Sequence, residues 1–206
     1  MSTTMAAERP RGRPASRRAP DARPTDPLAG SATTVRFLDV PERRCLMVDG
    51  HGAPEGNPEF QAAVGLLFSV AYALRWALKR ERALVTRVGP LEGLWDIGLD
   101  WRWTLFIGIP EEASDDDVTA AIQTAAERRA QPGLPGLRVE RWTEGRSAQI
   151  LHVGPYAAEA PPVERLTAAI RAAGHEPVGR HHEIYLGDPR RAAPDRLRTL
   201  IRRPIA

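Results

Sequence analysis

The segment from Arg180 to Arg191, RHHEIYLGDPRR, holds the side chains best suited to chemistry in this sequence. Its centre alternates as a strand does, which places His181, Glu183 and Tyr185 on one face and His182 on the other. A carboxylate among apolar and aromatic strand neighbours is costly to bury unless something pairs with it. Glu183 therefore either forms a structural ion pair with an arginine of the same segment or faces a cleft as a ligand-binding carboxylate.

Aromatic side chains gather in a second segment of the chain. Trp95, Trp101 and Trp103 lie within nine residues, and residues 101–107 alternate as a strand whose short polar link to residues 90–95 predicts a hairpin. Flat rings on a pleated surface either pack under a helix or line a site for a planar or cationic guest. Both interpretations remain open at the level of the sequence.

Two tyrosines and a phenylalanine complete the set of candidate site residues. Tyr156 follows a strand that Gly154-Pro155 ends, while Phe60 and Tyr72 belong to a long helix predicted from Asn57 to about residue 80. For Tyr72, packing in the core is the alternative to contact with a ligand. In an enzyme, Glu183 would be the general base for a water, and Tyr156 or Tyr72 would donate to a developing oxyanion.

Several kinds of chemistry have no motif in this chain. There is no Gly-x-Gly-x-x-Gly after a strand, no phosphate loop, and no His-Glu-x-x-His. His181, His182 and Glu183 are consecutive, and consecutive strand residues point to opposite faces, so they are not a metal motif. The single cysteine, Cys45, excludes an internal disulfide and a cysteine metal cage. We expect neither a metal nor another cofactor.

Composition narrows the class of partner. Of 29 basic and 26 acidic residues in the chain, the first 33 residues hold six and three, which leaves 23 of each for the remainder. A neutral body lacks the clustered cations on which nucleic-acid binding depends, so we expect no direct nucleic-acid binding. No stretch approaches the run of about 20 apolar residues that spans a membrane, and no secretory signal is present. We expect a cytoplasmic protein without a membrane partner.

The order of predicted elements indicates a duplicated α+β fold. Residues 1–33 are rich in arginine and proline and read as a disordered tail. In residues 34–206, two units of about 35–110 and 137–205 each contain a strand, a helix and a two-strand hairpin, and a helix over 114–129 joins them. The sheets of the two repeats are expected to meet along a cleft.

Several ordered motifs in residues 35–205 resemble those of stand-alone GyrI-like small-molecule-binding proteins. They are DGHG at 49–52, GNPEF at 56–60, SVAY at 69–72, PLEGLW at 90–95, QILHVGPY at 149–156 and HHEIYLGDPRR at 181–191. The resemblance implies duplicated β-α-β-β repeats of the SHS2 type with antiparallel sheets that form a central ligand cleft.

The resemblance also implies a class of ligand and a set of site residues. Relatives receive lipophilic, often cationic, molecules in an aromatic pocket with one buried glutamate, which Glu183 matches, and Trp95, Trp103, Tyr156 and Tyr185 are expected as walls. Some stand-alone members resemble hydrolases that open the strained cyclopropane of DNA-alkylating natural products. The sequence therefore leaves two functions: a protein that sequesters or senses lipophilic molecules, and a ring-opening hydrolase with Glu183 as base.

Overall fold

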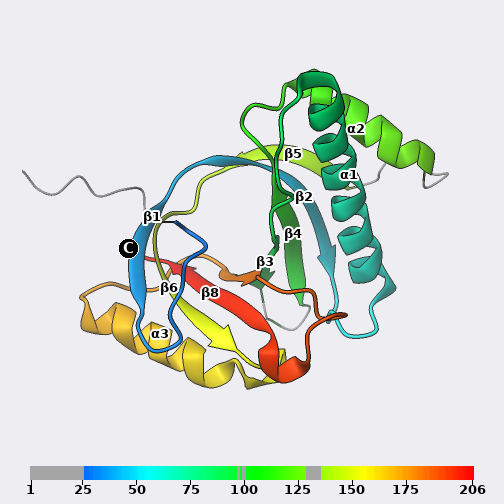
Figure 1. Cartoon of the computed structure of the whole chain (residues 1–206). Coiled ribbons are helices and arrows are strands. Elements are labelled where there is room, and N and C mark those ends of the chain that lie inside the picture. Colours follow the sequence, from blue (N-terminus) through cyan, green and yellow to red (C-terminus); the bar gives the residue numbers. More distant parts are fainter. Residues whose placement is uncertain (1–25, 97, 99–100, 129–135) are drawn as a thin grey trace, which may run out of the picture.

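The computed structural model describes residues 26–96, 98, 101–128 and 136–206. These residues form eight strands and three α-helices (Figure 1), together with two short 3-10 turns at Tyr156–Ala158 and Pro194–Arg196. The first half holds β1 (Arg36–Val40), β2 (Arg43–His51), α1 (Pro58–Arg82), β3 (Leu91–Asp96) and β4 (Arg102–Gly108). After α2 (Asp115–Arg128), the second half holds β5 (Leu137–Trp142), β6 (Gly145–Val153), α3 (Ala160–Ala172), β7 (His181–Tyr185) and β8 (Arg198–Pro204).

The eight strands form one antiparallel sheet in the order β1-β6-β8-β7-β3-β4-β2-β5. Three strands from each half of the chain are neighbours in the sheet, and the pairing of β3 with β7 joins the two groups at the centre. The first strand of each half crosses to the far edge of the other half, because β1 pairs with β6 and β5 pairs with β2. The predicted α+β fold of duplicated repeats is confirmed, with the two expected sheets fused into one.

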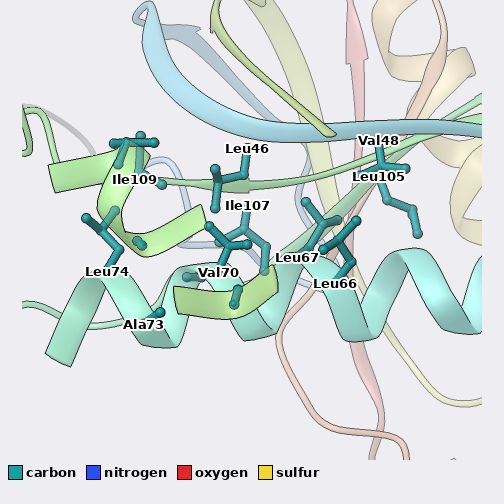
Figure 2. Close-up of a cluster of buried hydrophobic side chains, with 14 of the residues drawn as sticks. Leu46, Val48, Leu66, Leu67, Val70, Ala73, Leu74, Leu105, Ile107 and Ile109 are labelled. Carbon is teal, nitrogen blue, oxygen red and sulfur yellow. The ribbon is translucent and has the colours of Figure 1, made fainter. Parts of the chain in front are cut away.

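The first helix is long because its sequence supports both its start and its buried face. The Asn57 side chain accepts hydrogen bonds from the backbone N–H groups of Glu59 and Phe60, and Pro58 occupies the first helical position. Its apolar face packs on β2 and β4 (Figure 2), where the labelled side chains are Leu46, Val48, Leu66, Leu67, Val70, Ala73, Leu74, Leu105, Ile107 and Ile109. This core fixes α1 over one half of the sheet.

By length and hydropathy alone α1 is long and apolar enough to cross a membrane, contrary to the prediction from the sequence that no stretch is. In the fold it serves as a core helix, because Leu67, Val70 and Leu78 are fully buried and α2 packs beside it. The second half of the sheet has its own smaller core, in which Leu166 and Ile170 of α3 cover β6 and β8. Figure 1 shows α1 and α2 together over one half of the sheet and α3 over the other.

A buried network of charges ties the two halves together on the sheet face away from the helices. His182 lies between two carboxylates: its Nε2 is 3.0 Å from Glu92 Oε2 and its Nδ1 is 2.7 Å from Glu144 Oε1. Arg43 forms a two-pronged ion pair with Glu92, and Arg202 pairs with Glu144 at 2.8 Å. Because both ring nitrogens face carboxylate oxygens, both must donate, which makes His182 an imidazolium.

The charges in this network support each other's ionisation. Burial alone would raise the pKa of Glu92, but the hydrogen bond from His182 and the charge of Arg43 hold it at about 2. Burial opposes protonation of His182, yet the carboxylates of Glu144 and Glu92 leave its pKa raised. Loss of one member of such a network would leave its partners as uncompensated buried charges. The network therefore holds β7 against β3.

The prediction of a disordered tail over residues 1–33 is wrong for residues 26–33, which pack against the sheet. The Pro27 carbonyl accepts a 2.6 Å hydrogen bond from Arg202 Nη2, and the Ser31 carbonyl accepts one from the backbone N–H of Leu151. Leu28 packs beside Leu151, Ile184 and Leu200. Residues 26–33 are therefore part of the packed structure, since this segment supplies the acceptor for Arg202 Nη2. The rest of the predicted tail, residues 1–25, lies outside the described residues.

Candidate ligand-binding cleft

One row of side chains crosses the helix-bearing face of the sheet and locates the cleft. The strand registers align Val48, Leu105, Gly93, Glu183, Ile201 and Ile150 across six neighbouring strands. Helix α1 covers the first end of this row and α3 covers the last. The cleft lies between the two helices, has a volume of about 2260 Å³ and is lined on its floor by β3 and β7. Glu183 stands at the centre of that floor.

Glu183 is held by hydrogen bonds from its own strand. The Tyr185 hydroxyl donates to Glu183 Oε2 at 2.8 Å, and the Trp95 indole N–H donates in turn to that hydroxyl at 3.2 Å. His181 Nε2 lies 3.1 Å from Glu183 Oε1. Because residues 181, 183 and 185 alternate on one strand face, the sequence pattern brings all three into the cleft. The side chain of Glu183 keeps 13% of its surface exposed there.

The predicted alternative for Glu183, an ion pair with an arginine of its own segment, is not formed among the described residues. Arg180 donates instead to Thr104 Oγ1 at 2.7 Å and to the Leu94 carbonyl at 2.6 Å. Arg190 and Arg191 both lie against Asp188, in the surface ion pair that the turn sequence predicts. The carboxylate of Glu183 therefore faces the cleft without an arginine partner from its own segment.

A second carboxyl group, Glu159, shares the site and was missed in the sequence. It immediately precedes α3 as the N-cap residue, yet its side chain makes no capping hydrogen bond. It is 9% exposed, and its Oε1 has no hydrogen-bond partner among the described residues. Burial, and then the nearby charge of Glu183, raises the pKa of Glu159 to about 8. Glu159 therefore holds a proton at neutral pH.

The tyrosines beside this carboxyl pair stay neutral. Burial and then the charge of Glu183 raise the pKa of Tyr185 well above its usual value. Tyr156, whose ring meets that of Tyr185 edge to face at 5.7 Å, has its pKa raised by burial, by Glu159 and by Glu183. A neutral phenol can donate a hydrogen bond, as the Tyr185 hydroxyl does to Glu183.

Most of the expected aromatic residues line the cleft, with one exchange. Phe60, Tyr72, Trp95, Tyr156 and Tyr185 are all at its surface. The prediction that Trp103 lines the cleft is wrong. This residue is 1% exposed, belongs to the core under α1 and does not reach the cleft. Its indole N–H donates to the Gly52 carbonyl and its ring packs edge-on against Phe60.

Trp101 takes the place expected for Trp103. It is partly buried, lines the cleft and meets Trp95 edge to face at 6.0 Å. Sequence alternation puts Trp101 and Trp103 on the same strand face, so it could not separate the ring under α1 from the ring beside it. Tyr72 stands further along α1 and is 48% exposed, with its ring beside Phe68.

Gly93 makes room for the aromatic wall directly opposite Glu183. A Cβ at this position would lie 2.9 Å from Trp95 Nε1 and 3.2 Å from Trp95 Cε2. The ring of Trp95 therefore lies over the glycine, where it can donate to Tyr185. A side chain here would displace the ring, so the glycine in the PLEGLW segment is a requirement of packing.

The same cluster has the donor set of a metal site. Glu159, His181 and Glu183 each offer one ligand atom, and these atoms lie within 4.8 Å of one another. Consecutive residues of β7 cannot ligate one metal together, but His181 and Glu183 are two apart and share a face, and Glu159 comes from the start of α3. Carboxylate oxygens and an imidazole nitrogen are suitable ligands for a divalent cation, so the cluster can receive inorganic as well as organic positive charge.

Comparison with known proteins agrees with this architecture. Residues 33–206 match the GyrI-like small molecule binding domain, and the chain belongs to this family. The resemblance expected from the sequence motifs is thereby confirmed. No curated protein matches the chain.

Solved structures from Listeria innocua share the fold over most of both chains. An uncharacterized conserved protein is 30% identical, with a TM-score of 0.79 over 86% of this chain and 94% of its own. A hydrolase is 30% identical, with a TM-score of 0.75 over 87% and 94%. A hydrolase encoded by lin2189 is 29% identical, with a TM-score of 0.77 over 87% and 94%.

Proposed function

We propose that this small-molecule-binding domain receives lipophilic cations or electrophiles in the cleft, with Glu183 and Glu159 as the polar contacts. The observation that carries the proposal is a pair of carboxyl groups under aromatic walls, with no arginine or lysine of the described residues paired to either. Positive charge in an apolar cleft is strongly attracted to such groups because little water screens it. The faces of Trp95 and Trp101 add apolar area and cation–π contacts. Such a protein would sequester or sense its ligand.

A pair of ions with the same shape and opposite charge tests this function. Tetraphenylphosphonium and tetraphenylborate bury nearly the same apolar area, so a difference in their affinities reports the charge of the cleft. We expect the cation to bind at least about 10-fold more tightly, and Glu183→Gln to remove most of that preference, since hydrogen bonds to charged groups contribute about 1.5–3 kcal/mol. Isothermal titration calorimetry measures both affinities. Equal binding of the two ions, or a preference that survives Glu183→Gln, would refute the proposed site.

Hydrolysis is the second candidate function, and the asymmetry of the two carboxyl groups favours it. Glu159 keeps a proton at pH 7 while Glu183 accepts two hydrogen bonds, so an acid and a base face the same space. Two structural relatives are named hydrolases, which supports the same direction. Glu183 would take a proton from water as the water oxygen bonds to a strained ring carbon. The ring carbon–carbon bond breaks and its electron pair moves to a conjugated carbonyl oxygen. Tyr156 or Tyr72 would donate a hydrogen bond to that oxygen.

Turnover separates the two candidates. A spirocyclopropyl cyclohexadienone incubated with the protein in ¹⁸O-labelled water would give the ring-opened alcohol with one labelled oxygen, detected by mass spectrometry. We expect the rate to fall at least about 100-fold in Glu183→Gln, as for the removal of a general base. If the compound binds without being turned over faster than in buffer, the protein is a binder and the hydrolase assignment is wrong.

A further inference from the structure

Four arginines of the described residues line the cleft, and they differ in their partners. Three of them are engaged, because Arg180 donates to Thr104 and to backbone carbonyls while Arg190 and Arg191 lie against Asp188. Arg203, near the end of β8, has neither an ion pair nor a side-chain hydrogen bond to any residue in the described part of the chain.

The sheet register fixes where Arg203 lies relative to the carboxyl groups. Ile201 is the register partner of Glu183, and Arg203 follows two residues later on the same strand. Residues two apart on a strand share a face, so Arg203 and Glu183 project from the same side of the sheet. Two residues of strand advance about 7 Å. The cleft therefore has a carboxyl pole at Glu183 and a guanidinium pole at Arg203, two residues further along the strand direction.

Arg203 is partly removed from water and open to the cleft. The residue is partly buried, with Val163 and Thr167 of α3 among the other residues that line the cleft. Burial lowers the pKa of Arg203, and no carboxylate acts against that effect. A guanidinium that is removed from water normally pairs with an anion or with several oxygen acceptors. The described residues supply none to Arg203, so its guanidinium is available to a guest in the cleft.

We propose that Arg203 binds an anionic or carbonyl oxygen of the guest, displaced by about 7 Å along the strand direction from the cationic or electrophilic centre that faces Glu183 and Glu159. This inference rests on the proposed function and narrows its ligand class to molecules with two poles. In the hydrolytic version, the oxygen at Arg203 is the carbonyl oxygen that receives the electron pair of the broken ring bond. Arg203 would then stabilise the phenolate product until it takes up a proton from solvent.

Two phosphonium ions of closely similar shape test the second pole. In (4-carboxyphenyl)triphenylphosphonium the carboxylate stands roughly 7 Å from phosphorus, while tetraphenylphosphonium has no acceptor. We expect the carboxylate to tighten binding to the unaltered protein about 10-fold, as for a charge-assisted hydrogen bond to a guanidinium. Arg203→Met should abolish that gain without weakening tetraphenylphosphonium binding, because it removes a charge of the same sign from the cleft. Arg203→Lys should keep part of the gain, because it retains the charge and loses the two-pronged geometry.

Arg190→Met is the matched control, since Arg190 lines the cleft but is already paired with Asp188. It should leave the gain intact. The proposal is wrong if both phosphonium ions bind the unaltered protein equally, or if the gain survives Arg203→Met. Failure of the cation site has a different signature, in which neither phosphonium ion binds. In that case 4-phenylbenzoate, which has no cation, still reports Arg203: binding that Arg203→Met abolishes supports the anion site, and no binding overturns it.

Discussion

The raised pKa of Glu159 makes a prediction about stability that can be worked out in sign and size. Between pH 4.5 and 8 the folded protein holds a proton on Glu159 that the unfolded chain releases. Stability therefore falls as pH rises through this range, and the contribution is fully present only below the unfolded pKa of 4.5. Glutamine resembles the protonated carboxyl group and cannot ionise. We expect Glu159→Gln to leave stability nearly unchanged at pH 4.5 and to increase it at pH 8.5.

The expected size of the gain follows from the difference between the two pKa values. A step from 4.5 to about 8 corresponds to about 5 kcal/mol at about 1.4 kcal/mol per pKa unit. The cleft is open to water and Glu183 shares the effect, so about half of this, roughly 2–3 kcal/mol, should appear in unfolding. Urea unfolding at the two pH values, followed by far-ultraviolet circular dichroism, measures the difference.

A control on the same helix isolates the buried carboxyl group. Glu164 lies on the exposed face of α3, one turn from Glu159, and Glu164→Gln should change stability by less than about 0.5 kcal/mol at both pH values. The reasoning about Glu159 is refuted if Glu159→Gln changes the unfolding free energy by the same amount at pH 4.5 and 8.5. A destabilisation at pH 8.5 would show that Glu159 is held as an anion by a partner.

Three further predictions concern the cleft and the network behind it. Tetraphenylphosphonium should bind about 10-fold more tightly at pH 9 than at pH 6 by calorimetry, because Glu159 loses its proton, and an equal pH dependence in Glu159→Gln would contradict this. Gly93→Ala should cost about 1–3 kcal/mol in urea unfolding and weaken phosphonium binding, because the added methyl displaces the Trp95 ring; unchanged tryptophan fluorescence would argue against that displacement. His182→Leu should cost about 3–5 kcal/mol in urea unfolding, because two buried glutamates lose their shared donor, and a loss below about 1 kcal/mol would mean that water replaces it.

Local patterns in the sequence were enough to predict the helices and strands and the site residues on β7. Asn57-Pro58 fixed the start of α1, and the alternation in residues 181–185 placed Glu183 and Tyr185 opposite His182. The predicted joining helix over 114–129 is observed as α2, Asp115–Arg128, because its acidic first turn and apolar spacing are local signals. Such features depend on neighbours within a few residues, so periodicity and capping reveal them.

Contacts between residues far apart in the chain could not be predicted from these local patterns. Glu159 gave only a weak signal, a lone acid among alanines before a Pro-Pro helix start, and its meeting with Glu183 depends on how α3 lies on the sheet. The exchange of Trp103 for Trp101 depends on where the edge of α1 falls over β4.

The sequence by itself determined that a strand carries a carboxylate between a histidine and a tyrosine, within a duplicated α+β chain of a recognisable family. Tertiary structure alone decided that this carboxylate lies between two helices, faces a second carboxyl group and shares its cleft with Arg203, which has no ion-pair partner among the described residues. The physical reason is the pairing of β3 with β7, which brings two halves separated by about 90 residues of chain to one floor. No local pattern encodes that pairing, because it is stabilised by the buried charges of both halves.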